Sequence, residues 1–342
     1  MLYIRTDMNG QIATGHVMRC LSIADAAKAK GEDAIFILAD EQAVELLKQR
    51  GYAYIVLHTQ WNDMDSELPK LTAYIKEQKI ERILIDSYQV TEAYLKQLSQ
   101  MVQTYYIDDI DAFCYPVHGI ICYANYCAKF HYQERYSEAE LYLGTKYVPL
   151  RKEFCHCGAK IIKPKAECLL IMSGGSDTYG VLEKILEKLD QTLFQRVDVI
   201  CGMYYTDYES LKEKYQSYKN IRLHKAVQNL DEYMKKADLA ISAGGTTLYE
   251  LCAIGTPAIS YSIADNQLDN VRKFEEDGII AYAGDARKED ITGKLMNLIE
   301  KYREDAKLRA EISRKMQKLV DGKGAGRIAD ILSYAEKNFC SR

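Results

Sequence analysis

The sequence predicts an α/β protein made of two doubly wound domains that face a cleft. Its 342 residues are too many for one ordinary domain and suit two. Short apolar runs alternate with amphipathic stretches, which is the pattern of parallel strands connected by helices. This alternation starts again after residues 160–166, a Lys-rich segment that contains Pro164. We therefore expect domains at residues 1–155 and 166–342, joined by a linker at residues 156–165.

The first domain is expected to contain a sheet covered by helices. Its apolar runs predict strands at residues 2–5, 34–38, 54–57, 82–86, 104–107 and 119–122. The stretches between them predict helices at residues 16–30, 41–50, 66–78 and 91–101. Two of these helices are followed by a glycine, Gly31 or Gly51, as a left-handed C-terminal cap requires.

The second domain repeats the pattern. Strands are predicted at residues 168–172, 197–200, 221–223, 239–242 and 258–260. Helices are predicted at residues 180–189, 208–218, 230–237, 246–254 and 267–277. From residue 288 the pattern is helical to the end of the chain, with helices near residues 305–320 and 325–338. Ligands of doubly wound sheets bind beyond the carboxyl ends of the strands, so we expect the functional residues in the loops there.

Composition excludes several classes of protein. The chain is 48% hydrophobic and 27% charged, which is typical of a globular protein. A net charge of −4 argues against a broadly basic nucleic-acid binder. No apolar run approaches the roughly 18 residues of a membrane span, and the N-terminal residues lack the layout of a signal peptide. We therefore expect a cytoplasmic protein whose cysteines are mostly free thiols.

The ten cysteines do not predict a metal site. Zinc sites pair their ligands at two places, whereas Cys155-His156-Cys157 is too tightly spaced and no second pair follows. Asp109-Ile110-Asp111 matches the D-x-D pattern of some divalent-metal sites, but acidic loops of this kind are common by chance. We expect neither a metal ion nor a cofactor.

The loop after the first strand carries the candidate catalytic residue, His16. Gly15 and His16 stand where the first helix begins, and the positive end of its dipole favours an anion or a neutral imidazole there. A neutral imidazole accepts a proton, which suits a general base acting on water or a sugar hydroxyl. The alternative is a histidine that only starts the helix. Arg5, Asp7 and Arg19 flank it and either hold a substrate or form ordinary ion pairs.

Two strand–glycine turn–helix units in the second half predict an anion site. They read Ser173-Gly174-Gly175-Ser176-Asp177 and Ala243-Gly244-Gly245-Thr246-Thr247. Because glycine lacks a side chain, backbone N–H groups in such turns approach phosphate oxygens, and two turns can hold one diphosphate. Neither turn contains the Gly-Lys-Ser/Thr of a Walker loop or the G-x-G-x-x-G of dinucleotide sites. Kinase and NAD-dependent dehydrogenase functions therefore lose support.

Other polar residues lie close to these turns in the sequence. Glu250, one turn into its helix, either accepts hydrogen bonds from ribose hydroxyls or complements the helix dipole. Asn266 and Gln267 follow the next strand, and their amides suit a bridge between ligand and protein. In the first half, the Tyr-rich stretch 123–147 suits either the wall of a cleft or the core.

Several blocks spread along most of the chain occur together in one known family. They are Arg5-Thr6-Asp7, Gln11-Ile12, Gly15-His16-Val17-Met18-Arg19-Cys20, Leu143-Gly144-Thr145-Lys146-Tyr147, Leu150-Arg151-Lys152-Glu153-Phe154, Gly174-Gly175-Ser176-Asp177, Ala243-Gly244-Gly245-Thr246-Thr247 and Ala264-Asp265-Asn266-Gln267. With these blocks the chain resembles the UDP-2,4-diacetamido-2,4,6-trideoxy-β-L-altropyranose hydrolases of pseudaminic acid biosynthesis. That family is related to the glycosyltransferase that adds N-acetylglucosamine to the lipid-linked peptidoglycan precursor. The resemblance implies a GT-B fold, with two Rossmann-like domains, the sugar site mainly on the first and the nucleotide site on the second.

The resemblance also implies roles for individual residues. His16 would activate the attacking water, and the candidate substrate-binding residues are Arg5, Asp7, Gly15, Arg19, Asp86 and Tyr88. The candidate nucleotide-binding residues are Gly174, Gly175, Asp177, Gly244, Gly245, Thr246, Glu250, Asn266 and Gln267. Two positions depart from the family pattern: Ala13 replaces the first glycine of Gly-x-Gly-His, and Ser87 replaces the histidine of Asp-His-Tyr. If that histidine contacts the sugar, the substrate differs from the family's best-known one.

Three functions follow from these observations. The first is hydrolysis of a UDP-linked diacetamido-trideoxy sugar, in which water activated by His16 attacks the anomeric carbon and UDP leaves with inversion. The second keeps the fold and donor but transfers the sugar to an acceptor in surface or spore-coat polysaccharide synthesis. The third is a sugar-nucleotide-binding module without turnover. The first two share every motif.

Overall fold

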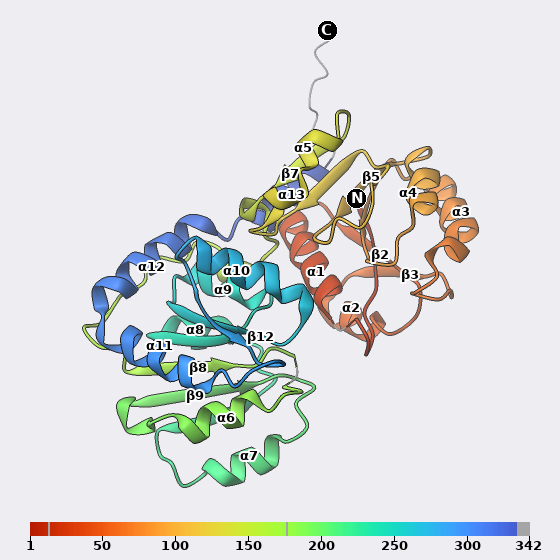
Figure 1. Ribbon diagram of the computed structural model, residues 1–342. Coiled ribbons are helices and arrows are strands. Elements are labelled where there is room, and N and C mark those ends of the chain that lie inside the picture. Colours follow the sequence, from red (N-terminus) through yellow and green to blue (C-terminus); the bar gives the residue numbers. More distant parts are fainter. Residues whose placement is uncertain (13, 176, 334–342) are drawn as a thin grey trace. The chain divides into compact units, whose positions relative to one another are not determined.

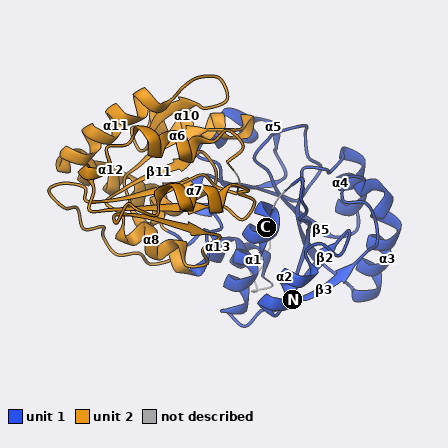
Figure 2. Ribbon diagram, turned by 90° about the horizontal axis from the view of Figure 1, so that it is seen from below, with its two compact units in different colours: residues 1–152, 322–342 blue, residues 153–321 orange. Residues whose placement is uncertain are grey.

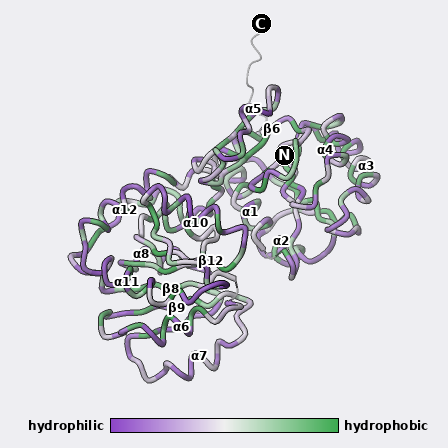
Figure 3. The backbone as a smooth tube through the Cα atoms, in the orientation of Figure 1, coloured by the Kyte–Doolittle hydropathy of each residue, from purple (hydrophilic) through white to green (hydrophobic). Residues whose placement is uncertain are grey.

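The computed structural model describes residues 1–12, 14–175 and 177–333, which form two compact units (Figure 1). Unit 1 comprises residues 1–152 together with the chain from residue 322, and unit 2 comprises residues 153–321 (Figure 2). Each unit has a parallel sheet, and hydrophobic segments gather in its interior while outer helices such as α7 (Tyr208–Tyr215) and α12 (Ala306–Leu319) are largely hydrophilic (Figure 3). The predicted α/β fold with two Rossmann-like domains is confirmed.

Unit 1 contains a seven-stranded parallel sheet with the order β3-β2-β1-β4-β5-β6-β7. The strands are β1 (Leu2–Thr6), β2 (Ala34–Leu38), β3 (Ala53–Val56), β4 (Arg82–Asp86), β5 (Gln103–Ile107), β6 (Gly119–Cys122) and β7 (Glu140–Leu143). The helices are α1 (Gly15–Lys28), α2 (Val44–Arg50), α3 (Leu68–Gln78), α4 (Glu92–Ser99), α5 (Tyr132–Arg135) and α13 (Gly324–Leu332). In Figure 1, α1 lies on one side of this sheet and α3 and α4 lie on the other.

Unit 2 contains a six-stranded parallel sheet with the order β10-β9-β8-β11-β12-β13. The strands are β8 (Cys168–Met172), β9 (Arg196–Cys201), β10 (Ile221–Lys225), β11 (Leu239–Ala243), β12 (Ala258–Ser262) and β13 (Ala281–Asp285). The remaining helices are α6 (Val181–Lys188), α8 (Leu230–Lys236), α9 (Thr247–Ile254), α10 (Leu268–Glu276) and α11 (Thr292–Glu304). In both units the strand order reverses next to the first strand, between β1 and β4 and between β8 and β11, which creates the crevice where doubly wound sheets bind ligands.

The predicted strands all form, within a residue or two at their ends. Gly51 takes the left-handed conformation that ends α2, with φ of 71°, and Gly31 has φ of 82° just beyond α1. Two strands were not predicted, β7 and β13, and both lie at a sheet edge. An edge strand has only one neighbour, so its sequence need not be a continuous apolar run. The predicted helix at residues 325–338 corresponds to α13, and its part beyond residue 333 lies outside the described residues.

The division into units differs from the predicted domains at the C-terminus. Helix α13 belongs to unit 1, where it packs on α1 and buries its apolar face. Gly324 makes this approach possible, since a Cβ atom at this position would lie 2.1 Å from the carbonyl oxygen of Val148. Lys30 Nζ donates to the carbonyl of Gly326 (2.9 Å), and Arg327 Nη1 donates to that of Lys146 (2.8 Å).

The predicted linker, residues 156–165, is an integral part of unit 2. Lys160 Nζ donates to the carbonyl of Lys235 at the end of α8 (2.5 Å), and Lys163 Nζ pairs with Asp238 (3.1 Å). Arg309, which is fully buried, donates to the carbonyls of Lys163 and Pro164 (3.0 Å each). These contacts tie the segment to helices α8 and α12.

The Tyr-rich stretch of unit 1 divides between the core and the carboxyl edge of the sheet. Tyr132 and Tyr136 are buried in the core, where the hydroxyl of Tyr132 donates to Asp108. The hydroxyl of Tyr123 instead accepts a hydrogen bond from Arg19 of α1, and that of Tyr126 donates to the carbonyl of Asp109, just after β5. The nine described cysteines are free thiols.

Candidate functional site

The predicted catalytic residue His16 and the predicted substrate-binding residue Asp86 meet at the point where the strand order of unit 1 reverses. β1 pairs with both β2 and β4, so the loop after β1, the start of α1 and the end of β4 share the carboxyl edge of the sheet. His16 stands in the first turn of α1, and Asp86 is the last residue of β4. The 70 residues that separate them in sequence are therefore bridged by topology.

His16 and Asp86 form a buried hydrogen-bonded pair. The two atoms, His16 Nδ1 and Asp86 Oδ1, lie 2.7 Å apart, and the side chains are 9% and 0% exposed. Burial opposes ionisation of Asp86, but the charge of Arg19 and the hydrogen bonds from Arg19 and His16 outweigh it and hold the pKa of Asp86 well below its usual range. Since an ionised carboxylate only accepts hydrogen bonds, the imidazole donates through Nδ1–H and keeps its lone pair on Nε2. A ring held in this tautomer can accept a proton from a nucleophile.

Arg19 joins this pair to a second layer of side chains. Its Nε donates to Asp86 Oδ2 (2.6 Å), its Nη2 donates to Asp86 Oδ1, and its Nη1 donates to the hydroxyl of Tyr123 (2.6 Å). Nη2 also lies 2.9 Å from His16 Nδ1, which is the geometry of two donors directed at the same carboxylate oxygen. The guanidinium therefore neutralises Asp86 while the carboxylate orients the imidazole.

Tyr88 and Asp109 complete the cluster. The Tyr88 ring packs edge-on against His16, with ring centroids 4.6 Å apart, and its hydroxyl donates to Asp109 Oδ1 (2.7 Å). Asp109 Oδ2 lies 3.4 Å from Arg19 Nη1, and the hydroxyl of Tyr126 donates to the backbone carbonyl of Asp109 (3.2 Å). Asp109 and Tyr123 were not among the predicted site residues. Asp109 and Tyr123 come just after the apolar strands β5 and β6, and this position in the sequence could have marked them as site residues.

Two predicted substrate-binding residues, Arg5 and Asp7, lie in a different cluster. Arg5 donates from Nε and Nη2 to the two carboxylate oxygens of Glu67 (2.7 and 2.6 Å) and from Nη1 to Asp7 (2.5 Å). Asp7 also accepts from the backbone N–H of Ala39 (2.8 Å), and the hydroxyl of Tyr94 donates to Glu67 (2.6 Å). Arg5 and Glu67 are 0% exposed. This geometry fixes the start of the loop after β1 and gives Arg5 no surface for a substrate.

The two glycine turns of unit 2 share one edge of the sheet, because β8 and β11 are paired in parallel. Gly174 has a φ of 82°, a left-handed conformation that favours glycine. Gly244 is required by packing, since a Cβ atom there would lie 2.3 Å from Val271 Cγ1 on α10. Gly175 and Gly245 face space: the nearest atom to a Cβ at Gly175 is 4.0 Å away, and none lies within 4 Å at Gly245. Open backbone of this kind allows a close approach of phosphate oxygens.

Gly202, which was not predicted, holds the loop after β9 against the first turn. A Cβ atom at Gly202 would lie 2.1 Å from the carbonyl oxygen of Gly174 and 2.3 Å from that of Gly175. The backbone N–H of Tyr204 donates to the carbonyl of Gly175 (3.0 Å). Ser173, directly before the turn, is fully buried, and its hydroxyl has no hydrogen-bond partner among the described residues.

Asp177 has a different role from the predicted one. Its two carboxylate oxygens accept the backbone N–H groups of Val181 and Leu182 (2.8 Å each), which are the free donors at the start of α6. The carboxylate thus occupies the N-terminus of α6. A phosphate bound in this unit would therefore have to be held by the backbone of the turns. Ser176, between Gly175 and Asp177, lies outside the described residues, as does Ala13 in unit 1.

The loop after β12 and the start of α10 support the second glycine turn. Gln267 Oε1 accepts the backbone N–H of Ile263 (2.9 Å), so this amide braces its own loop. Buried Asn270 Nδ2 donates to the carbonyl of Gly244 (2.9 Å) and accepts from the hydroxyl of Tyr249 (2.7 Å). Asn266 and Thr246 are exposed at this edge, and Glu250 is half-buried in the first turn of α9.

The D-x-D residues of unit 1 do not gather. Asp109 is bonded to Tyr88, whereas Asp111 pairs with Arg135. Within the described ranges, no group of three or more His, Cys, Asp or Glu side chains is placed to hold a metal ion. No helix in the described part of the chain is long and apolar enough to span a membrane.

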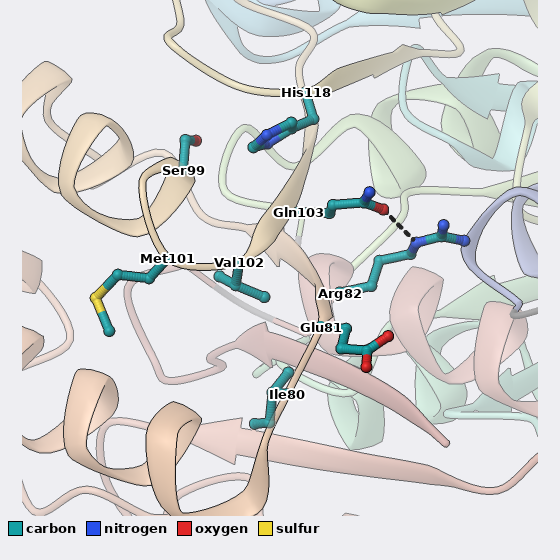
Figure 4. A pocket seen from close by; sticks show the side chains of 8 residues that line it. All are labelled: Ile80, Glu81, Arg82, Ser99, Met101, Val102, Gln103 and His118. Carbon is teal, nitrogen blue, oxygen red and sulfur yellow. Dashed lines mark hydrogen bonds between the residues drawn. The ribbon is translucent and has the colours of Figure 1, made fainter.

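A pocket of about 480 Å³ in unit 1 lies away from the His16 cluster (Figure 4). Its lining residues Arg82, Gln103 and His118 stand at the amino ends of β4, β5 and β6, and Arg82 Nε donates to Gln103 Oε1 (3.1 Å). Parallel sheets bind ligands at the carboxyl ends of their strands, whereas this pocket lies at the amino ends, away from His16 and Asp86.

Comparisons with known proteins define the class of fold. Residues 169–328 match the glycosyltransferase family 28 C-terminal domain. The crystal structure of MurG from Acinetobacter baumannii superposes with a TM-score of 0.71 at 14% identity, over 97% of this chain and 98% of that one. The spinosyn rhamnosyltransferase SpnG bound to spinosyn aglycone superposes with a TM-score of 0.65 at 12% identity, over 97% of this chain and 100% of that one. The chain therefore has the GT-B fold of these glycosyltransferases.

Two relatives show which glycosyltransferase-like proteins the chain resembles in sequence. The chain is 26% identical over 200 residues to the spore coat polysaccharide biosynthesis protein SpsG of Bacillus subtilis (strain 168), covering 56% of this chain and 58% of that protein. It is 32% identical over 174 residues to the UDP-N-acetylglucosamine--N-acetylmuramyl-(pentapeptide) pyrophosphoryl-undecaprenol N-acetylglucosamine transferase of Campylobacter jejuni (strain RM1221), covering 48% of each. The matched segments span about half the length of these curated relatives. This chain is thus a relative of SpsG and of the MurG-type transferases.

Proposed function

We propose that this protein transfers a glycosyl group from a UDP-sugar to a hydroxyl nucleophile in polysaccharide biosynthesis. The observation that carries the proposal is the His16–Asp86 pair, which leaves Nε2 of a buried imidazole able to accept a proton. A GT-B fold with a family 28 C-terminal domain and a relationship to SpsG and a UDP-N-acetylglucosamine transferase supports the donor and the reaction class.

In the proposed reaction each unit has a separate task. In unit 1, Nε2 of His16 takes the proton of the nucleophile's hydroxyl as its oxygen attacks the anomeric carbon. Asp86 stabilises the imidazolium that forms, and Arg19 keeps Asp86 ionised. In unit 2, backbone N–H groups of the turns at Gly174–Gly175 and Gly244–Gly245 stabilise the negative charge that develops on the departing diphosphate. Attack opposite the leaving group inverts the anomeric configuration.

Hydrolysis is the second candidate, with water as the nucleophile. It is supported by the sequence blocks around His16, the glycine turns and Ala264–Gln267, which resemble the pseudaminic acid pathway hydrolases. The relatives described above favour an acceptor hydroxyl instead, because they are transferases or polysaccharide biosynthesis proteins. The two reactions use the same base, leaving group and stereochemistry, and differ only in the nucleophile.

The test is NMR of the purified protein with a panel of UDP-sugars, with and without an acceptor carrying a free sugar hydroxyl. Transfer predicts a new glycoside of inverted configuration and UDP release that depends on the acceptor. Hydrolysis predicts UDP and free sugar without an acceptor. Binding of UDP-sugars with neither product would contradict both reactions.

His16→Asn tests the base, since the asparagine amide can still donate to Asp86 but offers no basic nitrogen. We expect UDP affinity to stay within about twofold while turnover falls by about 10²- to 10⁴-fold. The matched control is His131→Asn, because His131 has an exposed side chain and a φ of 52° that asparagine tolerates. Normal turnover in the His16 variant would rule out the assigned base.

A further inference from the structure

The loop after β9 presents large apolar side chains to solvent at the carboxyl edge of the unit 2 sheet. Met203 is 64% exposed and Tyr204 is 49% exposed, and Tyr179, in the loop before α6, is 40% exposed. Because they lie at the edge where doubly wound sheets bind ligands, these side chains are available to pack against one. None of these three residues takes part in the mechanism above.

Tyr204 is fixed beside the first glycine turn. Its backbone N–H donates to the carbonyl of Gly175 (3.0 Å), and the backbone N–H of Tyr205 donates to the carbonyl of Gly202 (3.2 Å). Gly202 has no room for a side chain against the carbonyls of this turn. Tyr205 is buried, with 6% of its surface exposed, and anchors the loop from within. The exposed ring of Tyr204 is thus attached to a well-held backbone.

The position of the ring relative to the turn is also defined. Tyr204 Cδ2 lies 4.0 Å from the place that a Cβ atom of Gly175 would take. A diphosphate bound to the backbone of Gly174 and Gly175 would therefore have an aromatic ring near it. In a nucleoside diphosphate the planar base follows the phosphates by one ribose, within reach of a ring at this place.

We propose that Tyr204 is the stacking platform for the base of the nucleoside diphosphate held by the glycine turns. The inference rests on the proposed function, because it takes its ligand from there. Stacking between a base and an aromatic side chain is tolerant of base identity, because every base has a π face. The ring therefore adds affinity for the nucleoside part of the donor and does not choose between uracil and thymine.

The test compares UDP with inorganic pyrophosphate by isothermal titration calorimetry. Tyr204→Ala should weaken UDP binding by about 5- to 150-fold and leave pyrophosphate binding within about twofold, because only the nucleotide has a base. Tyr204→Phe keeps the ring and should bind UDP like the wild type. Tyr218→Ala is the matched control, since Tyr218 is 41% exposed and precedes the amino end of β10.

The outcomes separate this inference from the proposed function. If the wild type binds UDP and Tyr204→Ala binds it equally well, the platform is wrong and the nucleotide site stands. If Tyr204→Ala loses UDP and pyrophosphate to the same extent, the residue shapes the turn and does not stack, which also overturns the inference. If the wild type binds neither UDP nor pyrophosphate, both proposals fail.

Discussion

Gly202 provides the sharpest test of how unit 2 is built. In Gly202→Ala the new Cβ atom would lie 2.1 Å from the carbonyl oxygen of Gly174, whereas real Cβ contacts essentially never fall below 3.0 Å. One of the two loops must therefore move by about 0.9 Å. Forcing an extra methyl group into a packed site costs about 1–3 kcal/mol. Loss of the hydrogen bond from Tyr204 to Gly175 adds about 1 kcal/mol, so we expect a loss of about 2–4 kcal/mol.

Urea denaturation followed by circular dichroism measures this loss. With a slope of about 2 kcal/mol per molar urea, the midpoint should fall by about 1–2 M. Gly245→Ala is the matched control, because no atom lies within 4 Å of its Cβ position and its φ is outside the left-handed region. We expect that variant to keep its midpoint but to bind UDP at least about tenfold more weakly, since the methyl group occupies the space that a phosphate needs. A Gly202→Ala protein within about 0.5 kcal/mol of the wild type would refute the packing argument.

Two further predictions concern titratable groups. The pKa of Asp86 is lowered in the folded chain, so its ionised form stabilises the fold above the usual carboxyl pKa of about 4, and this contribution is lost as the pH falls through the folded value. Asp86→Asn should melt at a lower temperature than the wild type at pH 7, with a gap that narrows toward pH 2–3; a gap independent of pH would contradict the assignment. The thiol of Cys122 donates to the sulfur of Cys127, which lowers the pKa of Cys127 to about 7. Iodoacetamide should therefore modify Cys127 with a half-maximal rate near pH 7 and leave buried Cys252 unmodified, as peptide mass spectrometry would show. Modification of Cys127 that begins only above pH 9 would exclude the hydrogen-bonded thiolate.

The parts of the fold that the sequence predicts are those whose residues are buried on both faces of a sheet. β8 is a continuous apolar run and β4 has the apolar centre Ile83-Leu84-Ile85, because parallel strands in the middle of a doubly wound sheet touch helices on both sides. β13 contains Gly284 and ends in Asp285, and it lies at a sheet edge, so no such run marks it. The docking of α13 on unit 1 depends on Gly324 fitting against Val148, a contact across 176 residues that no local pattern carries.

For the candidate site, the sequence predicts which residues lie at the carboxyl edge of a sheet but not which of them are bonded to other side chains. His16 and Asp86 stand at strand and helix ends that the reversal of strand order brings together, so their proximity follows from position. A polar residue at such an end faces either a ligand or another side chain, and the sequence does not say which. Arg5 is bonded to Glu67, which comes from a segment 62 residues away, and Asp177 caps its own helix. In both cases the partner, and not the position, decides the role.

Charge explains why the diphosphate is assigned to unit 2 although both units have the same strand order. In unit 1 the equivalent strand ends carry Asp86 and, on the next strand, Asp109, and both carboxylates would repel a diphosphate at close range. The single guanidinium of Arg19 is shared by these two carboxylates and leaves no positive charge for a diphosphate, so this edge suits a neutral sugar or hydroxyl. In unit 2 the corresponding strands β8 and β11 end in glycine turns, and the nearby carboxylate of Asp177 is turned to the helix N–H groups of α6. In the proposed reaction the same topology therefore supplies a proton acceptor in one unit and an anion-binding backbone in the other, and exchanging Gly245 for aspartate should abolish UDP binding without unfolding the chain.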